Sequence, residues 1–510
     1  MSPRSLRNTS TSDNPYTGGG RVIALILLFA VALYMFYSKG IAAFTIAFGI
    51  VPVMVLLIGA ALKYQMLVFW VLFVFNYLVF FLNRMGYMPL PLSVPNELFE
   101  MVLIALAIID AGILRFEKLA NNMFLALLIW LAYCLLEILN DTCEVGGDFT
   151  IWFTGARLIV FQLIYAFIVF SIYLDSPKKI MTWLKVWAGL VLFAALWCFK
   201  QQKLGFNDQE KIFLIVAART HIVNGITRYF SIFSDAANFG ISMSASATLF
   251  FIVAVSSKIK KDKILFFIAG FAATWAFFQS GTRTAIFCLL AGLMVYVVMS
   301  KSVKIAAVIG TTGAILVSLL MFTTIGNGID SVRRMRSGFN SKDASANVRK
   351  VNQAVIAKYM KDAPFGIGIG VDYSNVPETS KMRKVATIPP DSEYVYIWVH
   401  TGYVGITIFL LTTLLMWLSA CYIVMFKIKN KAVHGIGAGL CSAFIAYQLG
   451  GYGNQILMQF PNVVLFYGGL SVVFALPRLE KEFIKLEEER YAVQLEQERI
   501  KKEKKLEKRV

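Results

Sequence analysis

The sequence predicts an all-α, polytopic helical membrane protein with about 12–14 transmembrane helices and a long extracytoplasmic loop that contains an amphipathic helix. Composition is the first reason: 58% of the residues are apolar and 15% are charged, whereas soluble domains carry about a quarter charged residues. Apolar runs of the length that a bilayer requires also recur along the whole chain. Finally, lysine and arginine in the short connections alternate from side to side.

The apolar runs place the expected spans. Each run approaches the roughly 20 residues that a hydrocarbon core of about 30 Å requires. The expected spans are 22–37, 41–62, 65–82, 98–114, 122–139, 151–174, 180–198, 236–255, 264–279, 284–300, 304–322, 403–426, 434–452 and 459–476. The run at 22–37 shows no small-residue cleavage site, so we interpret it as a first span rather than as a removed signal peptide.

Basic residues in the short connections give the expected orientation, with both termini cytoplasmic. With the amino terminus inside, the cations of the short connections fall on the cytoplasmic side; they are Lys63, Arg115, Lys118, Lys178, Lys179, Lys258 to Lys263, Lys301, Lys304 and Lys427 to Lys431. The other short connections, such as 140–148, are poor in basic residues. This alternation supports both the number of spans and their direction.

The same features divide the chain into five segments. They are a disordered cytoplasmic amino terminus at 1–21, an amino-terminal transmembrane bundle at 22–199, a core at 200–426 with outer loops 200–235 and 323–402, carboxyl-terminal transmembrane helices at 427–477, and a charged cytoplasmic helical tail at 478–510. Leu479, Leu486, Val493 and Ile500 recur every seven residues in the tail, which favours a short coiled coil. The alternative is a solvated helix whose lysines lie on anionic lipid headgroups.

The cysteines and histidines predict neither a metal nor a cofactor. The six cysteines are scattered without a CxxC pair, and the chain has three histidines, which is a poor source of metal ligands. Cys143 and Cys198 could meet on an oxidising face, but free thiols that pack as small apolar groups are the simpler interpretation.

Two long connections on the expected outer face break the charge bias. Loops longer than about 12–15 residues are usually functional or disordered, and both 200–235 and 323–402 are rich in cations, Arg349 among them. Within the second loop, 346–362 has apolar residues at helical spacing and predicts an amphipathic helix on the membrane face. The glycine-rich segment 363–373 is interpreted as a flexible turn near a ligand. The cations indicate that an anion binds on this face.

Two arginines stand at the outer ends of spans. Arg228 precedes the span 236–255, and Arg283 lies in the short connection between 264–279 and 284–300. A charge at the bilayer centre costs about 2.5 kcal/mol or more, so such residues usually face a polar interior and are functional. An arginine that snorkels to lipid phosphates is the alternative for either residue alone. Together they favour a diphosphate site, because guanidinium forks match phosphate oxygens. Their polar neighbours are Asp235, Asn238, Ser280 and Thr282.

Four motifs together resemble the O-antigen ligase/polymerase superfamily of integral-membrane glycosyltransferases. In order along 225–412 they are "RYFSIFSDAANFG", "SGTRTAIF", a basic outer loop that ends in "PFGIGIG", and "DSEYVYIWVHTGYVG". Each motif is loose alone, and their order on one face makes the combination specific. The resemblance covers under half of the chain and lies inside the core at 200–426.

The resemblance implies that Arg228 and Arg283 grip a lipid diphosphate. It also places Asp391 where the family pattern His-Asn-x-Tyr has a histidine as its presumed general base, which is a departure from the family. Two interpretations of Asp391 follow: a base that deprotonates an acceptor hydroxyl, or the amino-terminal cap of the next helix. Glu393 is the second candidate for the base, whereas His400 is expected to be a packed core residue.

The expected function is that of a metal-independent membrane glycosyltransferase. It would polymerise or ligate polyprenyl-diphosphate-linked oligosaccharide, an O-antigen or related surface polysaccharide, on the periplasmic face of a bacterial inner membrane. The expected catalytic residues are Asp391, Arg283 and Arg228, and the expected substrate-binding residues are Asp235, Asn238, Ser280, Thr282, Tyr394 and Arg349. The expected partners are an undecaprenyl-type diphosphate-linked glycan donor, a glycan or lipid A–core acceptor and membrane lipids, with no nucleic acid.

Two other classes of function compete with this one. A transporter or flippase of lipid-linked oligosaccharide suits the number of spans and a basic cavity, but the sequence has neither an internal repeat nor a matched pair of Gly/Pro-broken helices. A structural membrane subunit that docks partners through its charged tail leaves the outer arginines unexplained.

Overall fold

The computed structural model describes residues 59–61, 63–86, 93–109, 116–145, 147–223, 225–337 and 344–507. The chain divides into two units, Met1–Val68 and Phe69–Val510, and every candidate site residue belongs to the second. The expected disordered terminus 1–21, the expected span 22–37 and most of the expected span 41–62 lie outside the described residues.

The described residues fold mainly into helices, which confirms the all-α polytopic prediction. Nine helical segments in this part of the chain are long and apolar enough to cross a membrane. They are α3 (Gln65–Arg84), α6 (Asn122–Leu136) with a 3-10 turn (Glu137–Leu139), α7 (Phe149–Ala156) joined to α8 (Gln162–Tyr173) by a π turn (Arg157–Phe161), α9 (Pro177–Lys203), α11 (Ala236–Ser256), α14 (Val303–Phe322), α18 (Glu393–Tyr422) with a π turn (Ile423–Lys427), α19 (Lys431–Gly453) and α20 (Asn462–Glu507). The remaining expected spans in this part are helical as well, as α4 (Ser93–Ile109), α12 (Lys260–Gln279) and α13 (Thr284–Ser300), and a short helix, α5 (Phe116–Leu119), precedes α6.

The centre of the bundle is α11. Of the residues in its most apolar stretch, 89% are buried, and the helix contacts α12, α13 and α19. Glycines permit these close contacts: a Cβ added at Gly292 would lie 2.7 Å from the Thr248 Cγ2 atom. By contrast α14, whose main neighbours are α13 and α15 (Asp330–Ser337), has 6% of the corresponding stretch buried. The exposed apolar side chains of α14 suit contact with lipid, because lipid tails are as apolar as the protein core.

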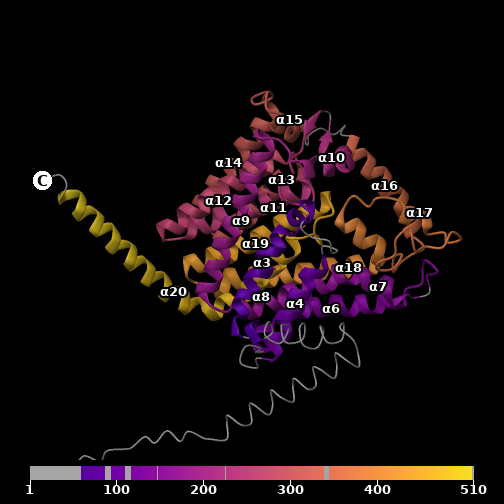
Figure 1. The fold of residues 1–510 in the computed structure, drawn as a ribbon, viewed down its shortest axis with the longest axis horizontal. Helices are drawn as coiled ribbons and strands as arrows, with labels where there is room; N and C mark the ends of the chain where they lie inside the picture. Colours follow the sequence, from indigo (N-terminus) through magenta and orange to yellow (C-terminus); the bar gives the residue numbers. More distant parts are fainter. Residues whose placement is uncertain are drawn as a thin grey trace, which may run out of the picture. The chain divides into compact units, whose positions relative to one another are not determined.

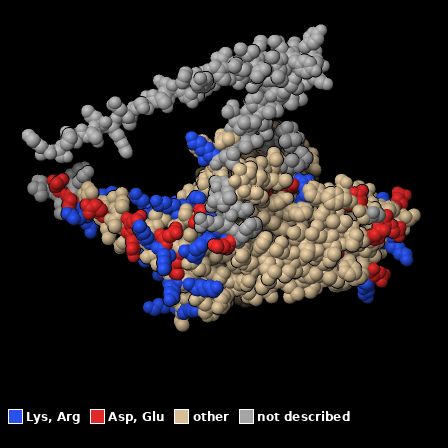
Figure 2. Space-filling model, turned by 90° about the horizontal axis from the view of Figure 1, so that it is seen from below, with Lys and Arg blue, Asp and Glu red and all other residues tan. Residues whose placement is uncertain are grey.

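Charged side chains are unevenly distributed over the molecule. In the face drawn in Figure 2 they gather at two ends, and the broad zone between them carries few. Independently of these two ends, we call the region of α10 (Asp208–His221), α15 and α16 (Ala344–Met360), along the upper edge of Figure 1, the site end, and the region from which α20 projects the tail end. The orientation of these ends in a membrane, like the division of the chain at 199 and 426, stays a prediction.

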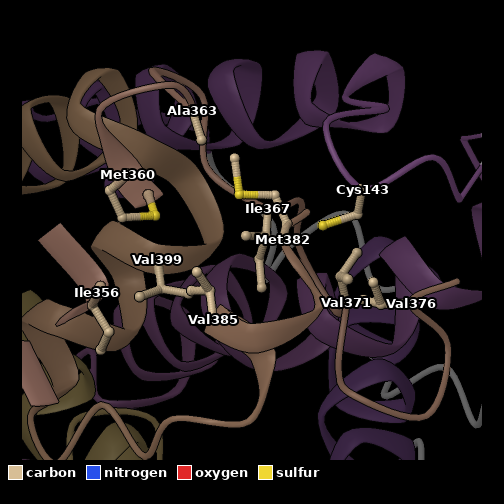
Figure 3. Packing of buried hydrophobic residues seen from close by; sticks show 10 residues of the cluster. All are labelled: Cys143, Ile356, Met360, Ala363, Ile367, Val371, Val376, Met382, Val385 and Val399. Carbon is tan, nitrogen blue, oxygen red and sulfur yellow. The ribbon is translucent and has the colours of Figure 1, made fainter. Parts of the chain in front are cut away.

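Both long connections are folded at the site end. The first contains α10 and a two-stranded antiparallel hairpin of β1 (Ile222–Val223) and β2 (Ile226–Thr227). The second contains α15, α16 and α17 (Arg383–Ala386) and forms a packed lobe. Figure 3 shows its buried core, to which α16, α17, α18 and the connection between α6 and α7 all contribute. Its members are Cys143, Ile356, Met360, Ala363, Ile367, Val371, Val376, Met382, Val385 and Val399.

The prediction of a flexible turn at 363–373 is wrong, because this segment is tightly bonded to α18. The backbone N–H of Ile367 donates to the Val399 carbonyl at 2.8 Å. A Cβ added at Gly366 would lie 2.5 Å from the Gly402 nitrogen, so only glycine fits there. The expected span 403–426 corresponds to the second helical segment of α18, which follows a break at Gly402. α18 begins at Glu393 and bends at Gly402, whose φ of 65° and ψ of −168° let two helical segments meet.

The tail is a direct continuation of the last span. α20 runs through Pro477 to Glu507, and its glutamates reach the basic connection before α12: Glu487 pairs with Lys258 at 3.2 Å and Glu498 with Lys260 at 3.4 Å. Val493 and Ile500 are exposed, and the coiled coil stays a prediction. The six cysteines are buried and free, as expected.

Candidate functional site

Arg228 stands directly after the β1–β2 hairpin, and the hairpin fixes its backbone. Its N–H donates to the His221 carbonyl at 2.7 Å. Its guanidinium crosses to the turn between α12 and α13, where Nη2 donates to the Thr282 hydroxyl at 3.1 Å and Nε to the Ser280 carbonyl at 3.4 Å. The side chain is half-buried. Two predicted site residues, Ser280 and Thr282, therefore hold Arg228 in place.

The α12–α13 turn itself is rigid. The Ser280 hydroxyl donates to the Phe277 carbonyl at 2.7 Å, and the Thr282 hydroxyl donates to the Ala236 carbonyl of α11 at 2.7 Å. Gly281 adopts a left-handed φ of 58°, and a Cβ there would lie 2.6 Å from the Cδ of Arg334. Glycine thus lets a second guanidinium approach: Arg334 Nε of α15 donates to the Gly281 carbonyl at 2.8 Å.

Four arginines gather around this turn, and we call them the arginine cluster: Arg228, Arg283, Arg334 and Arg349. Arg283 immediately precedes α13, and Arg349 lies on α16. Burial lowers the pKa of Arg228 to about 10, and the charges of Arg334, Arg283 and Arg349 act in the same direction, while Asp235 acts against them. Arg228 is still a cation at neutral pH. Because like charges are held together at a partly buried place, an anion with several oxygens would relieve their repulsion.

Asp235 and Asn238 support the loop that follows Arg228. The Asp235 carboxylate caps α11 by accepting from the N–H groups of Ala237 and Asn238, at 2.7 and 3.0 Å. The fully buried Asn238 amide donates to the Gln459 side chain at 2.9 Å and to the Phe460 carbonyl at 3.0 Å. These bonds tie α11 to the connection before α20. Contact of either side chain with substrate stays a prediction.

A residue that the motifs did not single out, Arg84 at the end of α3, clamps the same loop. Its guanidinium donates to the carbonyls of Ser231 at 3.0 Å, Phe233, and Ser234 at 3.3 Å. It also lies over the Phe230 ring, 4.3 Å from the centroid. This clamp fixes the backbone between Arg228 and Asp235.

Asp391 lies just before α18 in a conformation that is unusual for a residue with a side chain. Its φ is +57°, in the left-handed region, which Asp adopts more readily than most residues with a side chain. The cap interpretation is wrong: the residue at the cap is Ser392, whose hydroxyl donates to the Gly451 carbonyl at 3.1 Å instead. The Asp391 carboxylate accepts from the Asn352 amide of α16 at 3.0 Å and is half-buried.

Helix α16 connects Asp391 to the arginine cluster. Arg349 and Asn352 are three residues apart, so they share a face of this helix. One of them acts electrostatically on Arg228 and the other orients Asp391. Arg283 and Arg349 thus lie within electrostatic reach of Arg228, and Asp391 contacts the helix that carries Arg349.

The other polar residues at the start of α18 have structural partners. Glu393 is buried, and its carboxylate accepts from the Leu457 N–H at 2.8 Å. The Tyr394 hydroxyl donates to Gln448 of α19, with its carbonyl at 3.0 Å. His400 is buried with its Nδ1 3.0 Å from the Gly368 carbonyl, as expected of a packed core histidine. These contacts leave Asp391 as the carboxylate of this segment that lies toward α16.

Within the described residues, no group of three or more His, Cys, Asp and Glu side chains is placed to hold a metal ion. The chemistry of the site is that of guanidinium groups and one oriented carboxylate. Guanidinium groups stabilise charge that develops on phosphate oxygens, and a carboxylate within reach of a hydroxyl can take its proton.

Comparison with known proteins agrees with the motifs. Residues 265–410 match the family model of O-antigen ligase. This range includes Arg283, Arg334, Arg349 and Asp391, whereas Arg228 lies before it. No curated protein matches the chain. The match confirms the resemblance seen in the sequence: this multi-pass membrane protein carries a region, residues 265–410, that matches the O-antigen ligase family model.

Proposed function

We propose that the chain is a membrane glycosyltransferase that polymerises or ligates polyprenyl-diphosphate-linked oligosaccharide on the periplasmic face of the bacterial inner membrane. The observation that carries the proposal is the gathering of Arg228, Arg283, Arg334 and Arg349 beside the oriented carboxylate of Asp391. A donor with a diphosphate and an acceptor with a hydroxyl are the two reactants that such a site suits.

The arginine cluster would bind the donor diphosphate. When the anomeric carbon–oxygen bond breaks, the electron pair stays on the leaving diphosphate, whose negative charge grows. Fixed guanidinium groups stabilise that charge more in the transition state than in the ground state, and this difference accelerates the reaction. Ser280 and Thr282 would act by holding Arg228, through the contacts described above.

Asp391 would act as the general base. The acceptor hydroxyl oxygen attacks the anomeric carbon while its proton passes to the Asp391 carboxylate. The Asn352 amide bond to one carboxylate oxygen leaves the other available for the hydroxyl. The acceptor is a glycan end or a lipid A–core sugar. We propose that no metal is needed, because the arginines supply the positive charge, and addition of a chelator should leave the transfer rate unchanged.

The test uses Arg283→Ala and Asp391→Ala in cells that depend on this chain for long surface glycan. Arg333→Ala is the matched control, because Arg333 neighbours Arg334 but its side chain is 53% exposed. We expect both site variants to accumulate lipid-linked oligosaccharide on the outer face without long or transferred glycan, and Arg333→Ala to behave as wild type.

Two outcomes contradict the proposal. Accumulation of lipid-linked oligosaccharide on the inner face would favour the transporter or flippase alternative. Full activity of an expressed Asp391→Ala protein would reject the base and leave only the arginine site.

A further inference from the structure

Helix α10 turns apolar side chains outward. Ile212, Ile215 and Val216 are 56%, 79% and 88% exposed, whereas Glu210 on the opposite face is fully buried. A surface helix of a soluble protein has the reverse pattern, with its apolar stripe toward the core. A cluster of exposed apolar side chains on a helix outside the predicted spans indicates a surface that contacts the lipid bilayer or another molecule.

The position of α10 is fixed by the end of a spanning helix. The Glu210 carboxylate accepts from Trp197 Nε1 at 2.9 Å, Lys200 Nζ at 3.0 Å and Gln201 Nε2 at 2.7 Å, all in the last two turns of α9. Burial acts to raise the pKa of Glu210, but these bonds, with one from the Asn207 N–H, hold it below its ordinary value. The carboxylate is thus a charged anchor that ties α10 to α9.

The length of α9 allows its last turn to reach the membrane boundary. Its 27 residues span about 40 Å at 1.5 Å per residue, more than the roughly 30 Å of a hydrocarbon core. The last turn carries Lys200 and Lys203, which suit the headgroup layer. Leu196 and Phe199 of α9 and Leu204 after it are also exposed, at 67%, 50% and 81%, so the end of α9 and the start of the next connection present apolar side chains as α10 does.

We propose that α10 is an interfacial helix whose Ile212, Ile215 and Val216 side chains insert among the acyl chains of the lipid bilayer at the site end. Such a helix lies in the plane of the interface with its apolar face about 5–10 Å into the boundary between headgroups and acyl chains. The exposed Lys203, before the helix start, suits contact with lipid phosphates, whereas Lys211 pairs with Asp208 at 2.9 Å.

This placement sets the depth of Arg228 in the membrane. α10 leads directly into the β1–β2 hairpin. The backbone carbonyl of its last residue, His221, accepts a hydrogen bond from the Arg228 N–H. Phe213 of α10 also lies against the Arg84 guanidinium that clamps the following loop, 4.5 Å from centroid to guanidinium carbon. A lipid-anchored α10 would hold Arg228 at the level of a membrane-embedded diphosphate. This consequence rests on the proposed function, whereas the lipid contact does not.

The lipid contact is tested by fluorescence quenching on the full chain in nanodiscs of phosphatidylethanolamine and phosphatidylglycerol. The six native cysteines are buried, so a fluorophore can be attached to Val216→Cys. Leu196→Cys on α9 is the lipid-facing reference, and Glu378→Cys, whose native side chain is 92% exposed on the lobe, is the aqueous reference. Brominated acyl chains should quench the label at 216 nearly as strongly as that at 196. Quenching at 216 no greater than at 378 would overturn the inference and indicate a protein partner or open solvent.

The effect on activity separates this inference from the proposed function. Val216→Glu should lower transfer from a membrane-embedded donor by about tenfold, the equivalent of 1.4 kcal/mol in transition-state binding, while Val216→Leu keeps the wild-type rate. An unchanged rate in Val216→Glu would overturn the depth-setting role. Quenching at 216 together with full activity of Arg228→Ala would instead reject the proposed function and leave the lipid contact standing.

Discussion

The arginine cluster at the site end and the buried Asp262 at the tail end hold charge in opposite ways. At the tail end, the Asp262 carboxylate, with its side chain 4% exposed, pairs with Arg490 of α20 at 2.6 Å and with Lys185 of α9 at 2.9 Å. At the site end, the charges of Arg334, Arg283 and Arg349 act on Arg228 as like charges, and Asp235 acts against them. Opposite charges that meet fix one helix to another, whereas like charges held together favour the binding of an anion.

Arg84 shows that the difference does not depend on the type of side chain. It is a partly buried arginine at the site end, yet its guanidinium donates to three backbone carbonyls and lies over two aromatic rings. The contacts of Arg228 include the Thr282 hydroxyl and the Ser280 carbonyl, and the charges that act on it are those of Arg334, Arg283, Arg349 and, in the opposite sense, Asp235. We therefore expect substitutions in the arginine cluster to affect activity, and substitutions at the tail end to affect stability.

The largest effect is expected for Arg228→Ala. Removing one preorganised donor to a developing oxyanion lowers a rate by about 10²–10³-fold, or 2.7–4 kcal/mol. The free energy of unfolding should stay the same or rise slightly, because the change removes a repelling charge. Transfer rate and thermal unfolding of the purified protein measure the two quantities. Arg228→Lys should recover little of the rate, since ammonium lacks the planar fork of guanidinium.

The contrast between the two ends would be contradicted if Arg228→Ala lowered the unfolding temperature and left the transfer rate per folded molecule unchanged. Arg333→Ala, an exposed neighbour of the cluster, controls for loss of positive charge in general.

The next effect is expected for Asp262→Ala, in the opposite sense. Removing one partner of a buried ion pair costs about 3–5 kcal/mol, and because Lys185 and Arg490 are about a third exposed we expect about 3 kcal/mol. The transfer rate per folded molecule should not change. Thermal unfolding in detergent and the transfer assay check this, with Glu378→Ala on the exposed lobe as the control. A lost rate with unchanged stability would reverse the comparison.

A third effect sharpens the comparison without any mutation. Inorganic pyrophosphate at a concentration 100 times its dissociation constant should stabilise the folded protein by about 2.7 kcal/mol if it binds the arginine cluster. Arg283→Ala should remove the shift in unfolding temperature, whereas Asp262→Ala should keep it from a lower starting temperature. An equal shift in wild type and Arg283→Ala would show that pyrophosphate binds elsewhere.

Local patterns in the sequence predict the spans well but not their contacts. The hydropathy of a span depends only on residues that are adjacent in the sequence. Every expected span within the described residues is accordingly found as a helix. Hydropathy identifies the segment of α18 after Gly402 but not the helical turns before it, because Glu393 interrupts the apolar pattern; its carboxylate accepts from the Leu457 N–H, which lies far away in sequence. The glycines at 366 to 370 were misread for the same reason, since the surface they fit belongs to α18.

The residues of the candidate site likewise divide into those that the sequence could identify and those that it could not. Arg228, Arg283 and Asp391 could be named because each stands beside a recognisable motif at the end of a span. Arg334 and Asn352 could not, since the first is one of several cations in α15 and the second is an ordinary polar residue of α16. Their importance appears only when Gly281 and Asp391 are placed next to them.

The smallest effect is expected for Lys260→Ala at the tail end. Lys260 pairs with Glu498 at 3.4 Å, but the two side chains are 68% and 40% exposed, so water screens the pair. Exposed ion pairs contribute about 0.2–1 kcal/mol, and we expect a loss near the lower limit that vanishes in high salt. Thermal unfolding at low and high salt, beside Asp262→Ala, measures it. A loss as large as that of Asp262→Ala would mean that α20 is held by its many exposed contacts together, and that burial is not what distinguishes the charges that fix this helix.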